Sequence, residues 1–108
     1  MLEVDIKEKN KRLFCADGFN MSVQANSGAY CEPRNDEGPY SELEIGYPSQ
    51  LEELLMPWAE NPERPTHTVY AYVPSDVVLE VILKHGGFTK GDIPKMEMAL
   101  SNNYPGNR

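Results

Sequence analysis

The chain has 108 residues, with ten basic and seventeen acidic side chains and a formal net charge of −7. This length suits one compact domain and is too short for two. The excess of carboxylates disfavours direct nucleic-acid binding and docking on anionic membranes, since both depend on lysine and arginine. The sequence has no run of about 20 apolar residues that could span a membrane, and residues 1–12 contain no signal-peptide core. We therefore expect a cytosolic protein, in the cytoplasm of a host cell.

The cysteine and histidine residues are few and widely spaced. Sixteen positions separate Cys15 from Cys31 and eighteen separate His67 from His85, so neither pair has the close spacing of a zinc site. Two cysteines are also too few for a disulfide framework. We expect buried thiols in a reducing compartment, with no metal and no cofactor. A nucleophile pair of Cys31 and His67 stays open as an alternative, although the neighbouring Glu32 would oppose thiolate formation.

The first part of the chain is predicted to form strands. Residues 2–6 alternate apolar and acidic side chains, and residues 19–25 alternate apolar and polar ones, which is the period of a half-buried strand. Residues 12–16 form a further short candidate. The turn signal Asp17-Gly18 predicts that 12–16 and 19–25 pair as a hairpin.

A long connection over residues 26–41 is predicted next, because this segment is rich in Asn, Gly, Pro and acidic residues. Residues 29–31 could form a short strand within it. Residues 42–47 then place Leu, Ile and Tyr on one face and Glu on the other. This alternation predicts a strand, and Pro48 would end it.

Two segments are predicted to be helical. The run Ser49-Gln50-Leu51-Glu52 fits a capping box, and an apolar stripe follows it as far as Trp58, so we expect a helix over about 49–58 that Pro57 ends or bends. Apolar residues at helical spacing predict a second helix over about 75–85, which begins at a serine and ends before a glycine.

The apolar segment 69–73 lies between these two helices and predicts a central strand. Residues 88–100 read either as a short edge strand or as a frayed turn, and residues 101–108 should be a disordered tail. We therefore predict a single α+β domain over residues 1–100, with a mostly antiparallel sheet of four to six strands and both helices on one face. The alternative is a mixed sheet, with a right-handed βαβ crossover linking 42–47 to 69–73.

Acidic residues are concentrated in the middle third of the chain. Residues 32–63 hold nine acidic side chains and one basic one, Arg34. A solvated acidic face is the ordinary explanation, and a binding surface is the functional one. Tyrosines beside this region favour a protein interface, because tyrosine has an apolar ring and a polar tip. The candidate partner-binding residues are Glu32, Asp36, Glu37, Tyr40, Glu42 and Glu44.

Several segments between residues 22 and 87 resemble a family of small uncharacterised proteins from phage and prophage genomes. The likeness rests on residues 22–25, 30–40, 45–49, 69–74 and 85–87. The resemblance brings no catalytic residues. It implies a phage accessory protein that works by stoichiometric binding to a host complex, such as a CRISPR effector or another antiviral defence machine.

Four functional hypotheses follow from these observations. We expect a non-enzymatic protein that binds a host protein through its acidic, tyrosine-containing surface and inhibits a defence or nucleic-acid-processing complex. A small-molecule or nucleotide binder is the second hypothesis, and an enzyme that uses Cys31 or His67 is the third. A virion or structural role, with self-assembly into a homo-oligomer, is the fourth. The donors for a nucleotide would be Arg34, Arg64, His67 and Lys90.

Overall fold

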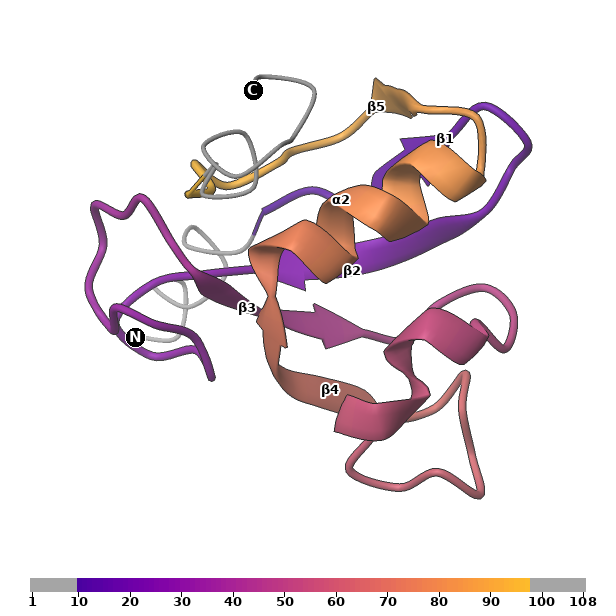
Figure 1. Ribbon diagram of the computed structural model, residues 1–108, viewed down its shortest axis with the longest axis horizontal. Helices are drawn as coiled ribbons and strands as arrows, with labels where there is room; N and C mark the ends of the chain where they lie inside the picture. The colour runs from indigo at the N-terminus through magenta and orange to yellow at the C-terminus, as the bar shows by residue number, and fades with distance from the viewer. Residues whose placement is uncertain (1–9, 98–108) are drawn as a thin grey trace, which may run out of the picture.

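The computed structural model describes residues 10–97, which form a five-stranded antiparallel sheet with two helices on one of its faces (Figure 1). The strand order in the sheet is β4-β3-β2-β1-β5, so the expectation that residues 69–73 form a central strand is wrong and this strand lies at an edge. The predicted single α+β domain is confirmed. The strands are β1 (Leu13–Cys15), β2 (Asn20–Gln24), β3 (Glu42–Gly46), β4 (Val69–Pro74) and β5 (Phe88–Lys90).

The predicted hairpin is formed by β1 and β2, which pair antiparallel with Leu13 opposite Met21. The amide of Gly18 donates to the carbonyl of Cys15 at 3.0 Å and closes the turn. The predicted strand over residues 2–6 and the tail over residues 101–108 lie outside the described residues. Residues 29–31 form no strand, although the adjacent Glu32 makes an isolated bridge with Glu42.

β3 and β4 are antiparallel neighbours, so the alternative with a βαβ crossover between them is wrong. The residues between these strands form a 3₁₀ helix and a loop, after which the chain runs back beside β3 in the opposite direction. The register shifts between Leu43 and Ile45, where β4 contains a bulge. As a result, Tyr70 points into the core while Tyr72 is exposed.

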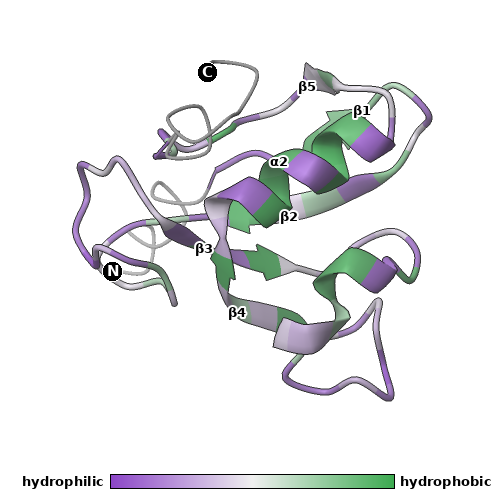
Figure 2. Ribbon diagram, viewed as in Figure 1, coloured by the Kyte–Doolittle hydropathy of each residue, from purple (hydrophilic) through white to green (hydrophobic). Residues whose placement is uncertain are grey.

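The helix α2 (Ser75–Lys84) lies across one face of the sheet and buries Val78, Val81 and Ile82 against it (Figure 1). The apolar residues of α2 lie on the side of the helix that faces the strands (Figure 2). The chain leaves the helix through Gly86, whose φ of 93° is the left-handed conformation that glycine favours. The strands contribute their inward residues to the same core: Leu13, Cys15, Met21, Val23, Leu43, Ile45, Tyr70 and Val73.

The first predicted helix is shorter and of another type than the capping box indicated. It is a 3₁₀ helix, η1 (Glu53–Trp58), and its N-cap is Glu52 rather than Ser49. The Glu52 carboxylate accepts from the amide of Leu54 at 2.9 Å, whereas the Ser49 hydroxyl accepts from the amide of Asn20. Pro57 lies inside the element and the helix ends one residue later at Trp58, as the sequence indicates, so the helix is shorter at its start and not at its end.

Beyond β5, the chain runs along the β2–β3 loop. Of the segment 88–100, residues 88–90 form the edge strand β5. Further along, Met96 makes an isolated parallel bridge with Tyr40. Within residues 10–97, no helix has the length and apolar character needed to cross a bilayer.

Candidate functional site

The predicted acidic residues gather on and beside the loop that joins β2 to β3, at the left of the molecule in Figure 1. We call this surface the acidic platform and define it as the exposed residues of the loop 26–41 together with Glu42 and Glu44 of β3 and Tyr72 of β4. Glu32, Asp36 and Glu37 are exposed on the loop, and the two β3 residues are half-buried. Figure 2 shows the loop as mainly hydrophilic. The structure therefore brings five of the six predicted residues to one region of the surface.

Tyr40, the sixth predicted residue, does not lie on this surface. Its side chain is 4% exposed, and burial raises the pKa of its hydroxyl. The hydroxyl donates to the carbonyl of Asn35 at 2.9 Å, and the Tyr40 amide donates to the carbonyl of Lys95. Tyr40 thus supports the loop from beneath, and a partner could not contact its ring.

The loop of the acidic platform is fastened by its own side chains. The Asn35 carboxamide oxygen accepts from the amides of Glu37 and Gly38, both at 2.9 Å. The Asp36 carboxylate accepts from the amide of Ser27 at 2.8 Å and so ties the two limbs of the loop together. These contacts hold the carboxylates in a defined arrangement.

Two exposed tyrosine rings complete the acidic platform. The rings of Tyr30 and Tyr72 lie 5.9 Å apart, and the Arg34 guanidinium lies 5.8 Å from the centre of the Tyr30 ring. The amide of Tyr30 donates to the Glu44 carboxylate, and its carbonyl accepts from the amide of Tyr72. Alternation along residues 69–73 predicts that Tyr70 and Tyr72 share one face of the strand, and this is wrong because the bulge in β4 turns Tyr72 away from the core. Its φ of 58° marks that bulge.

A second cluster of ionisable groups lies on the side of the sheet that α2 covers, at the start of η1. We call it the buried ionic cluster after Glu52 and His85, which are buried, while its other two members, Asp17 and Lys84, are exposed. His85 Nε2 lies 2.6 Å from Glu52 Oε1, and His85 Nδ1 lies 2.7 Å from Asp17 Oδ2. Lys84 Nζ donates to Glu52 Oε2 at 2.7 Å. Ionised carboxylates only accept, so both ring nitrogens donate and His85 is an imidazolium.

The pKa values in this cluster favour the charged forms. Burial acts to lower the pKa of His85, but its bonds to Glu52 and Asp17 outweigh burial and raise it. Burial acts to raise the pKa of Glu52, but the bonds from Lys84 and His85 outweigh it and lower the pKa. The Phe19 ring stacks on His85 with centroids 4.1 Å apart. Each ring nitrogen already has a partner and Glu52 is 1% exposed, so this geometry suits structure rather than catalysis.

Cys31 and His67, the possible nucleophile pair, are not brought together. The Cys31 thiol is fully buried and donates to the carbonyl of Asn26 at 3.2 Å, and the carbonyl of Pro33 lies 3.4 Å from the same sulfur. His67 lies in the exposed loop before β4, where its ring contacts the Thr66 hydroxyl. Burial raises the pKa of Cys31, which opposes formation of a thiolate.

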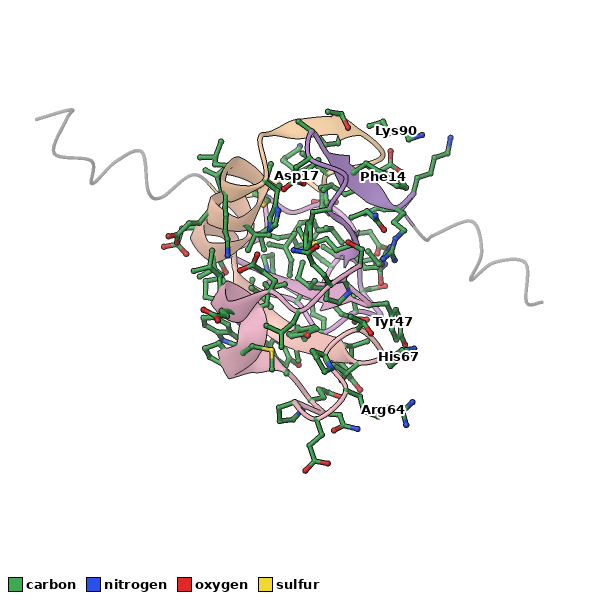
Figure 3. The ribbon with its side chains drawn as sticks, turned by 90° about the vertical axis from the view of Figure 1, so that its right-hand side faces the viewer. Phe14, Asp17, Tyr47, Arg64, His67 and Lys90 are labelled. Carbon is green, nitrogen blue, oxygen red and sulfur yellow. The ribbon has the colours of Figure 1, made fainter. Side chains whose placement is uncertain are left out.

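The four cations that could hold a nucleotide also lie apart. Arg64 and His67 share the loop before β4, while Lys90 lies at the other end of the sheet beside Phe14 (Figure 3). Arg34 belongs to the acidic platform. Among residues 10–97, no three His, Cys, Asp or Glu side chains are placed to hold a metal ion.

Comparisons with known proteins do not add a function. No protein-family model, curated protein or solved structure matches the chain. The function therefore has to follow from the chemistry of the surfaces themselves, of which the acidic platform is the most strongly charged.

Proposed function

We propose that the protein is a non-enzymatic binding protein that docks its acidic platform onto a basic surface of a partner protein. The observation that carries the proposal is the gathering of five carboxylates and two exposed tyrosine rings around a fastened loop. A preorganised loop loses little conformational entropy on binding. Tyrosine rings are common at the centre of interfaces, and charge complementarity speeds association.

Basic protein surfaces that bind nucleic acid are the natural partners of such a platform, because its carboxylates compete with phosphate groups for the same lysines and arginines. The resemblance to small phage proteins favours a host antiviral or nucleic-acid-processing complex as the partner. In this proposal the protein acts as an inhibitor by occupying that basic surface.

The proposal is tested by reversing charges on the acidic platform while keeping its framework. Glu37 and Glu42 are the residues to change to lysine, since the Glu44 carboxylate also holds the amide of Tyr30. The matched control changes Glu60 and Glu63 to lysine. Both are exposed in the loop before β4, so the control and the platform variant differ from the wild type by the same net charge. Tagged wild-type, platform and control proteins are used to capture partners from host lysate at low and high salt.

The expected result is a partner that the wild-type and control proteins capture at low salt and release at high salt. The E37K/E42K protein should lose it, because each reversal places a lysine against a basic surface. A partner that the platform variant still captures as well as the wild type would contradict the proposal. So would equal loss with the control variant, since that would show a nonspecific charge effect.

The nucleotide-binding alternative has no comparable support, because its four candidate cations do not converge. A virion or structural role would instead appear as self-association of the purified protein without any captured partner. Size-exclusion chromatography of the wild-type protein separates that outcome from the proposed one.

A further inference from the structure

The face of the sheet opposite α2 carries cations and aromatic rings that are separate from the acidic platform. In Figure 3, Phe14 and Lys90 lie at one end of this side, and Tyr47, His67 and Arg64 lie at the other. We call this surface the basic stripe and define it by six residues: Arg12, Phe14, Tyr47, Arg64, His67 and Lys90.

Direct contacts link the basic stripe across the sheet. Lys90 Nζ lies 4.9 Å from the centre of the Phe14 ring, and Phe14 is paired with Asn20 of β2. Arg12 Nε donates to the Asn20 carboxamide oxygen at 2.6 Å, and the same guanidinium donates to the carbonyl of Tyr47. The stripe is therefore a connected surface from β5 to the end of β3.

The far end of the stripe continues into the loop before β4. The amide of Tyr47 donates to the carbonyl of Thr68 at 3.0 Å, next to His67. The amide of His67 in turn donates to the carbonyl of Arg64 at 2.8 Å, so these two side chains belong to one turn. Both residues are exposed.

Tyr47 is an exposed ring held by an unfavourable backbone conformation. Its side chain is 51% exposed and its φ is 49°, in the left-handed region that glycine or asparagine would occupy with less strain. Core packing does not explain a tyrosine at this position. Strained residues of this kind are concentrated at binding surfaces.

The local charge of this face differs from that of the whole chain. The outward-facing residues on the described parts of β1, β2 and β5 are Phe14, Asn20, Ser22, Gln24 and Lys90, with no carboxylate among them. Glu44 of β3, opposite Gln24, is the first carboxylate met along the strands themselves. The ends of the stripe are flanked by carboxylates: Asp92 accepts from the amide of Lys11, and the exposed Glu60 and Glu63 lie in the loop of Arg64. The middle of this face is therefore less acidic than the chain as a whole.

We propose that the basic stripe binds single-stranded nucleic acid, with Phe14 and Tyr47 stacking on bases and the cations contacting phosphates. A sheet face that combines aromatic rings with lysine and arginine suits a single strand, because unpaired bases expose the flat surfaces that stack. In a duplex the flat surfaces of the bases are stacked on one another, and an acidic peptide has no bases to stack. The proposal does not depend on the function proposed for the acidic platform.

The test measures binding of fluorescein-labelled oligo(dT) and oligo(U), each of about 15 nucleotides, by fluorescence anisotropy with the full-length protein. We expect micromolar binding at about 50 mM salt, with a log–log salt slope of roughly −2 from three phosphate contacts. Removing a ring in F14L or Y47L should weaken binding about tenfold, which lies within the range that stacking contributes per base. Removing a charge in K90Q or R64Q should weaken binding and make the salt slope shallower.

Matched controls come from the acidic side of the molecule. Tyr30 and Lys95 are also exposed, so Y30L and K95Q remove a ring and a charge outside the basic stripe and should leave affinity unchanged. Circular dichroism and the thermal midpoint of each variant show whether it is folded. If Y47L fails to fold, Tyr47→Asn takes its place, because it removes the ring at a position where asparagine tolerates the backbone.

Several results would overturn the proposal. One is an unchanged anisotropy at protein concentrations of about 1 mM at low salt. Another is equal affinity of the wild-type and both ring variants. Oligoglutamate that competes as well as the oligonucleotide would show a site for any anion, and a duplex that binds more tightly than the single strand would exclude stacking on bases. A preference between oligo(dT) and oligo(U) would support the proposal, and oligo(dU) then separates the effect of the sugar from that of the C5 methyl group of thymine.

Discussion

His85 Nε2 and Glu52 Oε1 lie 2.6 Å apart, although 33 residues separate them in the chain. This contact joins the end of α2 to the N-cap of η1. Glu52 also accepts from Lys84 and from the amide of Leu54, so both of its carboxylate oxygens are bonded inside the protein. Asp17 extends the cluster to the β1–β2 turn. Three separate parts of the fold are therefore fastened at one buried ionic cluster.

Replacing Glu52 by alanine should destabilise the protein by about 3–5 kcal/mol, because it leaves the buried His85 cation without its main partner. Urea unfolding followed by circular dichroism measures this loss. The neighbouring Glu53 is exposed, so E53A should change stability by less than about 0.5 kcal/mol. Equal effects of the two substitutions would show that the cluster contributes little.

Stability should pass through a maximum at mildly acidic pH. The pKa of His85 is raised in the folded protein, so its contribution is complete below the unfolded value of 6.5 and is lost as pH rises through the folded value. The pKa values of Glu52 and Asp17 are lowered from 4.5 and 3.8. Their contribution is complete above those unfolded values and is lost as pH falls through the folded ones. Urea midpoints measured across this pH range test the prediction.

The control for this pH profile is the other histidine. H85Q should remove the loss of stability on the alkaline side, whereas H67Q should keep the profile of the wild type, because His67 is exposed and bonded only to Thr66 among the described side chains. Stability that rises steadily from pH 6.5 upwards in the wild type would contradict the assignment of His85 as a buried cation.

Gly91 should tolerate no side chain. A Cβ atom there would lie 2.0 Å from the carbonyl oxygen of Arg12, and its φ is 106°. We expect G91A to lose about 3 kcal/mol or more, since β5 would have to move away from β1. Gly18 has a similar φ of 97° but open space around it, so G18A should lose only about 1 kcal/mol. Thermal unfolding of both variants tests this, because G18A reports the cost of a positive φ alone and G91A adds the clash with the Arg12 carbonyl.

Removing the Tyr40 hydroxyl should weaken the support of the acidic platform. In Y40F the carbonyl of Asn35 loses its donor, so stability should fall by about 1 kcal/mol. Y30F removes the hydroxyl of an exposed ring and should leave stability unchanged. Amide hydrogen exchange of Glu37 and Gly38 would report the loosening directly, and unchanged exchange in Y40F would argue against this role for Tyr40.

Both thiols should react slowly with an aromatic disulfide reagent in the folded protein. Cys15 and Cys31 are buried, and burial raises the pKa of each thiol. Two thiols per chain should react in denaturant. A native thiol that reacts as fast as a free cysteine would revive the hypothesis of cysteine chemistry.

The pattern of side chains predicted the sheet because alternation reports which face of a strand is buried. Residues 42–47 and 19–25 have this alternation, and both contain the strands expected. The capping box at Ser49 misled the prediction because Glu52 has two possible roles, on the helix surface or in the interior. Only the positions of Lys84 and His85 decide between them, and no local pattern contains that information.

The acidic platform shows the same division. Its carboxylates could be identified from the sequence, because charged residues in a proline- and glycine-rich connection remain at the surface. The burial of Tyr40 and the exposure of Tyr72 depend on a bridge to Met96 and on a bulge opposite Glu44. A tyrosine fits either environment, so its residue type could not predict the outcome.

The sequence by itself determined the α+β class, the hairpin, the limits of α2 and the acidic character of the middle third, because each depends on neighbouring residues and local periodicity. Only the tertiary structure decided that the acidic residues divide between an exposed platform and a buried ionic cluster, and that Arg12, Phe14, Tyr47 and Lys90 form one stripe. Pairings of this kind join residues far apart in the chain, and they are chosen by the register of strands rather than by local preference.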